Sequence, residues 1–213
     1  LYKNAGTSIR TFLKQKIPIY ERYRKLSKFV GFAGKILNAD GFKVYQYSKA
    51  KQPHLTAKQV QKRLPDEMFS QYFKFAIVRN PWSWVVSNYH YVLNKEDHFQ
   101  HEQVKKLEGF RDYVDLMLET KEDCQKDFVV DENGDLIVDF VGKLENLNSA
   151  MNEVCSNLGV QYDGLPHSNS SPHKAWQEYY DQETFLKVRD FFQQDIEFFE
   201  YRDDPEDYGI ESS

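Results

Sequence analysis

The chain has 213 residues, of which 40% are hydrophobic and 15% aromatic, and this size and composition are typical of one folded domain with an apolar core. The charged fraction of 29% argues against a disordered chain, and no apolar run of about 18 residues is present that would span a membrane. The two cysteines, Cys124 and Cys155, make neither a disulfide framework nor a metal set, so they favour a reducing compartment.

The net charge of −5 conceals an uneven distribution. Residues 1–63 hold 15 basic and 2 acidic side chains, whereas the rest of the chain holds 13 basic and 31 acidic ones. A positive first third attracts anionic ligands, although a solvated basic helix around Lys14–Lys35 explains most of these lysines equally well. A nucleic-acid partner is not expected, because the acidic remainder would repel it.

The first part of the chain predicts a loop followed by a helix. Residues 3–8 are small and polar, and an apolar stripe at helical spacing begins at Ile9, with Thr7 or Ser8 as the expected N-cap. Lys43–Tyr47 alternates as a short strand does, and Thr56–Leu64 is expected to be a helix capped by Thr56.

Phe73–Val78 is the clearest strand, because it is short, apolar and rich in β-favouring residues. Arg79 follows it directly, and Pro81 suits the first turn of the next helix. Arg79 is therefore expected at a strand-to-helix turn.

The second half predicts three further helices and a hairpin. The helices cover Val104–Met117, Leu147–Leu158 and a final segment capped by Thr184, and a turn at Asp131–Gly134 joins two short strands. Alternating strands and helices indicate an α/β fold in three layers, with a central, mainly parallel sheet flanked by helices. We expect one domain over residues 1–202 and a frayed acidic tail over residues 203–213.

The loop Lys3–Ser8 has the features of an anion site. Backbone N–H groups at the start of a helix point outward, and the helix dipole places its positive end there. Gly6 permits close approach, Thr7 and Ser8 supply hydroxyls, and Lys3 adds a full charge. The pattern differs from the ATP-binding P-loop, because Lys3 precedes the loop's only glycine. A capped helix with a chance lysine would have the same sequence.

Arg79 and Ser87 form a second candidate site. Ligands of open α/β sheets bind beyond the carboxyl ends of strands, and a guanidinium matches phosphate with a fork of donors. Ser87 lies about two helical turns after Arg79. The alternative is that Arg79 pairs with a carboxylate and Ser87 is a packing residue.

These two motifs, in this order, resemble the PAPS-dependent sulfotransferases (PAPS is 3′-phosphoadenosine 5′-phosphosulfate), and in particular the chondroitin 4-sulfotransferase-like carbohydrate branch and its bacterial members. The loop Lys3-Asn4-Ala5-Gly6-Thr7-Ser8 resembles the family's phosphosulfate loop, and Phe75–Trp82 with Ser87 and Tyr89 resembles its 3′-phosphate motif. Further likeness covers most of the chain: His54–Ala57, Val138–Leu147, Tyr179-Tyr180, Asp195-Ile196, Phe199 and Tyr201.

The resemblance implies a P-loop-like sulfotransferase fold and a metal-independent, in-line transfer of a sulfuryl group from PAPS to a hydroxyl, leaving 3′-phosphoadenosine 5′-phosphate. It implies that Lys3 neutralises the leaving group, that residues 4–8 hold the phosphosulfate, and that Arg79 and Ser87 bind the 3′-phosphate. His54 matches in place the general base of heparan-type relatives, although a surface histidine at a helix start would look the same. The acceptor implied is a carbohydrate.

Two departures from the family pattern stand out. Family members carry a strand before the phosphosulfate loop, whereas this sequence begins at Leu1, so either that first strand lies upstream or the fold is compromised. Ser83-Trp84 replaces an Asp-Arg pair often seen after the tryptophan, which concerns packing or adenine contacts more than chemistry.

Other candidates are weaker. His98 and His101 have helical spacing that would suit a metal but suits a solvated helix face better, and His173-Lys174 lies in a loop that would close on a ligand. The rival functions are a nucleotide-dependent kinase-like enzyme and a non-catalytic module that binds anionic glycans. A bacterial cytoplasmic location is favoured over the Golgi lumen, because no anchor and no cysteine pairs are apparent.

Overall fold

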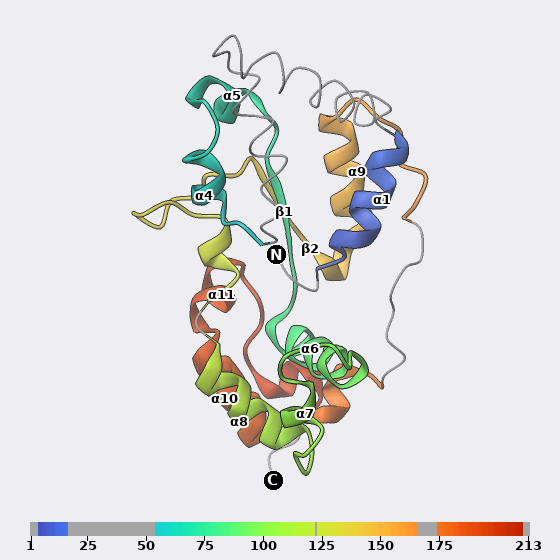
Figure 1. Cartoon of the computed structure of the whole chain (residues 1–213), viewed down its shortest axis with the longest axis vertical. Helices are drawn as coiled ribbons and strands as arrows, with labels where there is room; N and C mark the ends of the chain where they lie inside the picture. Colours follow the sequence, from blue (N-terminus) through green and yellow to red (C-terminus); the bar gives the residue numbers. More distant parts are fainter. Residues whose placement is uncertain (1–3, 17–53, 122, 166–173, 211–213) are drawn as a thin grey trace. The chain divides into compact units, whose positions relative to one another are not determined.

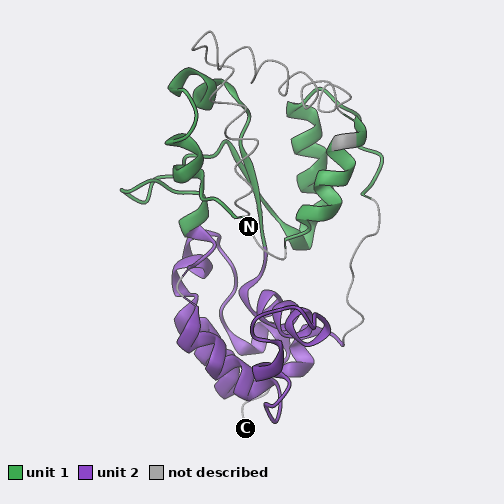
Figure 2. Cartoon of the chain, viewed as in Figure 1, with its two compact units in different colours: residues 1–78, 127–168 green, residues 79–126, 169–213 purple. Residues whose placement is uncertain are grey.

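The computed structural model describes residues 4–16, 54–121, 123–165 and 174–210 (Figure 1). The chain divides into two compact units (Figure 2). Unit 1 comprises residues 1–78 and 127–168, and unit 2 comprises residues 79–126 and 169–213. Both strands of the described sheet belong to unit 1.

Unit 1 contains a small parallel sheet. Strand β1 (Phe75–Val78) pairs with β2 (Phe140–Lys143), with Phe75 opposite Phe140 and Val78 opposite Lys143. The predicted strand at Phe73–Val78 is therefore confirmed, with a later start. Its first residues lie outside the strand because the N–H of Lys74 donates to the Asp139 carboxylate at 2.6 Å, in place of a ladder carbonyl.

The helices of unit 1 match the sequence prediction in part, because the helix expected over Thr56–Leu64 ends at Gln61 and a helix at Asp66–Gln71 was not predicted. They are α1 (Gly6–Lys16), α4 (Ala57–Gln61), α5 (Asp66–Gln71), α9 (Leu147–Asn157) and the 3₁₀ turn Leu144–Asn146. Thr56 caps α4 as predicted, because its hydroxyl accepts the Gln59 N–H and the Gln59 side chain accepts the Thr56 N–H. The helix predicted over Leu147–Leu158 is confirmed as α9, and the chain leaves it at Gly159 in a left-handed conformation.

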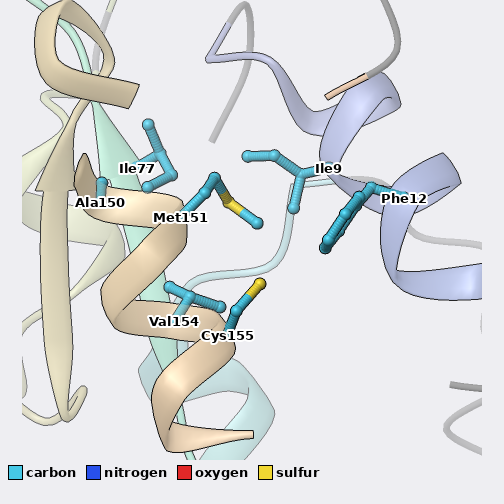
Figure 3. Close-up of a cluster of buried hydrophobic side chains, with 7 residues drawn as sticks. All are labelled: Ile9, Phe12, Ile77, Ala150, Met151, Val154 and Cys155. Carbon is cyan, nitrogen blue, oxygen red and sulfur yellow. The ribbon is translucent and has the colours of Figure 1, made fainter. Parts of the chain in front are cut away.

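The core of unit 1 lies between α1, α9 and β1. Ile9 and Phe12 on α1 point toward Met151 and Cys155 on α9, with Ile77 of β1 beside them (Figure 3). The cluster is completed by Ala150 and Val154. Burying these side chains removes apolar area from water at about 25 cal/mol per Å², so this packing fixes α1 and its opening loop to the sheet.

The predicted hairpin forms as a tight turn with a single antiparallel bridge, Val130 to Leu136, and not as two strands. The Asp131 carboxylate accepts the N–H groups of Asn133 and Asp135, and Gly134 takes a positive φ of 87°. These local bonds satisfy the backbone inside the turn without a longer ladder.

Unit 2 is helical over its described residues. Its elements are α6 (Pro81–Asn94), α7 (His101–Val104), α8 (Phe110–Thr120), α10 (Gln182–Phe191), α11 (Gln193–Phe198) and two 3₁₀ turns, Trp176–Tyr179 and Pro205–Tyr208. A 3₁₀ turn at Lys126–Phe128 carries the chain from unit 2 to unit 1. Trp82 is fully buried in unit 2, where it stacks on Phe185 with ring centroids 4.3 Å apart.

Three predictions in unit 2 are wrong. The single helix expected over Val104–Met117 is broken before Gly109, where the Asp112 carboxylate accepts the Glu108 N–H and starts α8. The last helix is capped by Asp181 and not by Thr184. Thr184 is the third residue of that helix, and its hydroxyl accepts the Asp181 N–H. That helix also divides at Phe192 into α10 and α11.

The acidic tail is also more ordered than expected. Its residues Pro205–Tyr208 form a 3₁₀ turn, Ile210 is buried, and the Tyr208 ring contacts Trp82 and Trp176. The tail packs because it contains the apolar side chain of Ile210 and the ring of Tyr208 among its carboxylates.

The mixture of helices with a small parallel sheet is compatible with the predicted α/β class. The three-layer, P-loop-like arrangement and the domain limits stay predictions. Three predicted segments lie outside the described residues: the strand Lys43–Tyr47, most of the helix around Lys14–Lys35, and the loop that contains His173. Among the helices that the structure describes, none combines the length and the hydropathy needed to cross a bilayer.

Candidate functional site

The loop that opens α1 is anchored to strand β1. The side-chain amide of Asn4 donates a buried hydrogen bond of 2.7 Å to the carbonyl oxygen of Ile77. Asn4 is only 3% exposed, so this bond is shielded from water. It holds the start of α1 beside the carboxyl end of a parallel strand, the edge at which open α/β sheets bind ligands.

Helix α1 begins at Gly6, and its first backbone bond runs from the Ile9 N–H to the Ala5 carbonyl at 3.1 Å. Thr7 and Ser8 are thus inside the first turn, and the prediction that one of them is the N-cap is wrong. Ala5, in the cap position, takes a φ of 57°, which turns the chain sharply into the helix. The N–H groups of Gly6, Thr7 and Ser8 belong to the turn in which a helix supplies no acceptors of its own.

Gly6 is exposed, and a Cβ built on it would meet no atom within 4 Å from the part of the chain that the structure describes, apart from its chain neighbours and its own helix backbone. Neither close packing nor a positive φ therefore explains a glycine at this position. An anionic group held against the backbone would fill that space, because a side chain would separate it from the N–H donors. The loop residues thus fit a phosphate-like group.

A pocket of about 420 Å³ lies next to this loop within unit 1. Asn4 and Gly6 line it together with Leu55 and Ala57, and most of the remaining lining is apolar, including Phe75 and Ile77 of β1. The structure thereby brings the loop and the segment that follows His54 to the same pocket.

His54 is an exposed residue with a φ of 68°, and it lies two residues before the helix cap Thr56. Partial desolvation lowers the pKa of its imidazole below 6.5, and the positive charge of Arg10 on α1 contributes in the same direction. The shift favours the neutral ring, the state in which a histidine accepts a proton.

Arg79 is held by the helix it precedes. The side chain of Asn80 caps α6 by accepting the Ser83 N–H at 3.0 Å. Pro81 occupies the first helical position, as predicted. The guanidinium Nε of half-buried Arg79 donates to the Ser83 hydroxyl at 2.9 Å.

Ser83 and Ser87 lie one helical turn apart, both buried, on the same face of α6. Arg79, Ser83 and Ser87 thus follow one another at intervals of four residues. The sequence analysis selected Arg79 and Ser87 and missed Ser83 as a partner of Arg79. The four-residue spacing was the available signal, because such side chains share a helix face.

The model of the sulfotransferase family matches residues 23–202. The chain belongs to the sulfotransferase family. The matched range includes Arg79, Ser83 and Ser87 and begins after the loop Lys3–Ser8. Searches of curated proteins and of solved structures find no match.

The remaining candidates of this sulfotransferase are placed as follows. Buried His101 contacts the Val92 carbonyl through Nδ1 at 3.0 Å, and His98 Nδ1 accepts the Gln100 N–H, so both rings serve the fold around α7. Within the described ranges, no group of three or more His, Cys, Asp or Glu side chains is arranged to hold a metal. Lys3 and His173 lie outside the described residues, and Lys174 is exposed.

Proposed function

We propose that this sulfotransferase moves a sulfuryl group from PAPS to a hydroxyl of an acceptor. The observation that carries the proposal is the row Arg79, Ser83 and Ser87 along one face at the start of α6. A guanidinium with two hydroxyls matches a phosphate dianion, and a 3′-phosphate is what distinguishes PAPS from ATP.

The loop Lys3–Ser8 would hold the other anionic end of the donor. Its support is the first turn of α1, whose N–H groups have no acceptor within the helix, and the space over Gly6 that the other described residues leave open. Lys3 is proposed to neutralise the charge that develops on the leaving phosphate oxygen, as the family resemblance implies.

In the transfer, a bond forms between the acceptor oxygen and sulfur, and the bond from sulfur to the phosphate oxygen breaks. The hydroxyl proton passes to the base, for which we propose His54, and 3′-phosphoadenosine 5′-phosphate leaves. The lowered pKa of His54 supports this role because the neutral ring has a nitrogen ready to accept the proton.

We propose a carbohydrate as the acceptor and the bacterial cytoplasm as the compartment. The acceptor class rests on the resemblance of both motifs to the carbohydrate branch, and the compartment rests on the low cysteine content.

Calorimetric titration with 3′-phosphoadenosine 5′-phosphate, AMP and ATP tests the donor. We expect the first nucleotide to bind most tightly, and Arg79→Ala to remove most of its advantage over AMP. Arg189→Ala is the matched control, because Arg189 is in the same unit and pairs with Asp190 at the surface. Equal binding of ATP, or no binding of any nucleotide, would contradict the proposal.

Turnover separates an enzyme from a glycan-binding module. With PAPS and a panel of polysaccharides, we expect sulfate incorporation that Lys3→Ala abolishes. A module that only binds glycans would retain its polysaccharide affinity in Lys3→Ala and show no incorporation in the wild type. A kinase-like enzyme would instead transfer phosphate from ATP.

A further inference from the structure

The backbone of Arg79 is clamped by the side chain of Gln125. The Arg79 N–H donates to Gln125 Oε1 at 2.9 Å, and Gln125 Nε2 donates to the Arg79 carbonyl at 2.7 Å. The oxygen and the nitrogen of the Gln125 amide thus bond to the backbone N–H and carbonyl of Arg79, 46 positions away in the sequence. Gln125 is 7% exposed, so water does not compete freely for these bonds.

Gln125 is in turn held by a buried carboxylate. Asp195, in α11, is 0% exposed, and its two oxygens accept the backbone N–H groups of Gln125 and Lys126 at 2.9 and 2.8 Å. A buried carboxylate is costly unless it is fully hydrogen-bonded, so its presence here requires that this segment keep its position. All four residues belong to unit 2.

These contacts hold Arg79, whose side-chain orientation is critical for binding a phosphate. A guanidinium recognises phosphate through a planar fork, so its usefulness depends on where the backbone points it. The Ser83 hydroxyl orients the Arg79 side chain at Nε, and Gln125 fixes the backbone from which that side chain extends.

We infer that Gln125 is a positioning residue that orients Arg79 toward the 3′-phosphate, and that Asp195 fixes the position of Gln125. The inference rests on the proposed role of Arg79 in binding PAPS. It assigns selectivity for a 3′-phosphorylated nucleotide to a residue that does not itself contact the nucleotide.

Gln125→Met tests the inference, because methionine has a similar length and lacks both polar groups. The quantity to measure is the ratio of the dissociation constants of AMP and 3′-phosphoadenosine 5′-phosphate. We expect this ratio to fall about tenfold, since hydrogen bonds to a charged group lose strength when misaligned, while AMP binding is retained. Gln193→Met is the control, because Gln193 is an exposed glutamine of the same unit that contacts Glu197.

Coupling to Arg79 distinguishes positioning from general destabilisation. In an Arg79→Ala background, Gln125→Met should cause no further loss of selectivity, because the group it aims is gone. Equal losses in both backgrounds, or equal losses for AMP and the 3′-phosphorylated nucleotide, would overturn the inference. If Gln125→Met fails to fold by circular dichroism, Gln125→Asn keeps a neutral amide but is one methylene shorter, so it cannot make both bonds to the Arg79 backbone at their present lengths.

The outcomes also separate this inference from the proposed function. If the wild-type protein binds AMP and the 3′-phosphorylated nucleotide equally well, the proposed function itself is contradicted. If the preference depends on Arg79 and is unchanged by Gln125→Met, only the inferred role of Gln125 is contradicted.

Discussion

The side-chain amide of Asn4 bonds to the carbonyl of Ile77, 73 residues away, and so ties the opening of α1 to the last residues of β1. The donor is a neutral amide in a buried setting. Together with the packing of α1 in the core, this bond holds the loop that we propose for the phosphosulfate, and it leads to the first prediction.

Asn4→Asp should lower both stability and anion binding. The variant keeps the shape but sets a carboxylate against the Ile77 carbonyl, so we expect a loss of about 1–3 kcal/mol in the free energy of unfolding, measured by urea denaturation. The added negative charge should also weaken binding of 3′-phosphoadenosine 5′-phosphate. Asn152→Asp, on the exposed side of α9, should change stability by no more than about 0.5 kcal/mol. Equal effects of the two substitutions would contradict the anchoring role.

Gly6→Ala should separate stability from binding. Because the added Cβ meets no atom of the other described residues and alanine favours a helix, the melting temperature should stay constant or rise slightly. The methyl group would stand between the ligand and the N–H donors, so we expect calorimetric affinity for the product nucleotide to fall at least about tenfold. Gly109→Ala, whose added Cβ likewise meets nothing within 4 Å in the described ranges, should leave affinity unchanged. Unchanged affinity in Gly6→Ala would mean that the anion binds elsewhere.

The acid limb of the pH–rate profile should report His54. A base must be neutral, and partial desolvation lowers the pKa of His54, so the midpoint of the acid limb should lie below that of an ordinary histidine. Arg10→Gln removes a charge that lowers this pKa, so the decline should move to higher pH. His54→Gln should reduce kcat by about 10²–10⁴-fold.

The control for this profile is Lys62→Gln, which removes a surface charge that pairs with Glu132. It should leave the acid limb where it is. If His54→Gln keeps full activity, the base is another group.

Gly142→Ala should destabilise unit 1. A Cβ on Gly142 would lie 2.5 Å from the Ala150 Cβ and 2.9 Å from Ile77 Cδ1, so β2 and α9 must separate to admit it. We expect a loss of about 1–3 kcal/mol in unfolding free energy, as for other overpacked cores. Adding Ala150→Gly should restore part of that loss, and the double-mutant cycle should show coupling. Simple additivity would show that the contact does not limit packing.

Much of the local structure was predictable from the sequence. The strand ending at Val78, the turn at Arg79 and the helix begun by Pro81 are all as expected, because apolar β-favouring residues, a capping Asn80 and a proline act over a few residues. The cap at Thr56 is correct for the same reason. The caps at Thr7 or Ser8 and at Thr184 were misplaced, because several neighbouring side chains have the chemistry of a cap and packing chooses among them.

The residues that position the candidate site were not predictable. Gln125 clamps Arg79 across 46 residues and Asp195 supports Gln125 across 70, and no local pattern specifies such partners. The same holds for Asn4 and Ile77.

The sequence by itself determined the residue types that bear charge and the local elements that carry them, since propensity and capping depend on near neighbours. It also determined membership in the sulfotransferase family. Only the tertiary structure decided which buried polar groups fix those elements in place. A buried donor or acceptor must find a partner, and that partner is whatever the folded chain brings within about 3 Å.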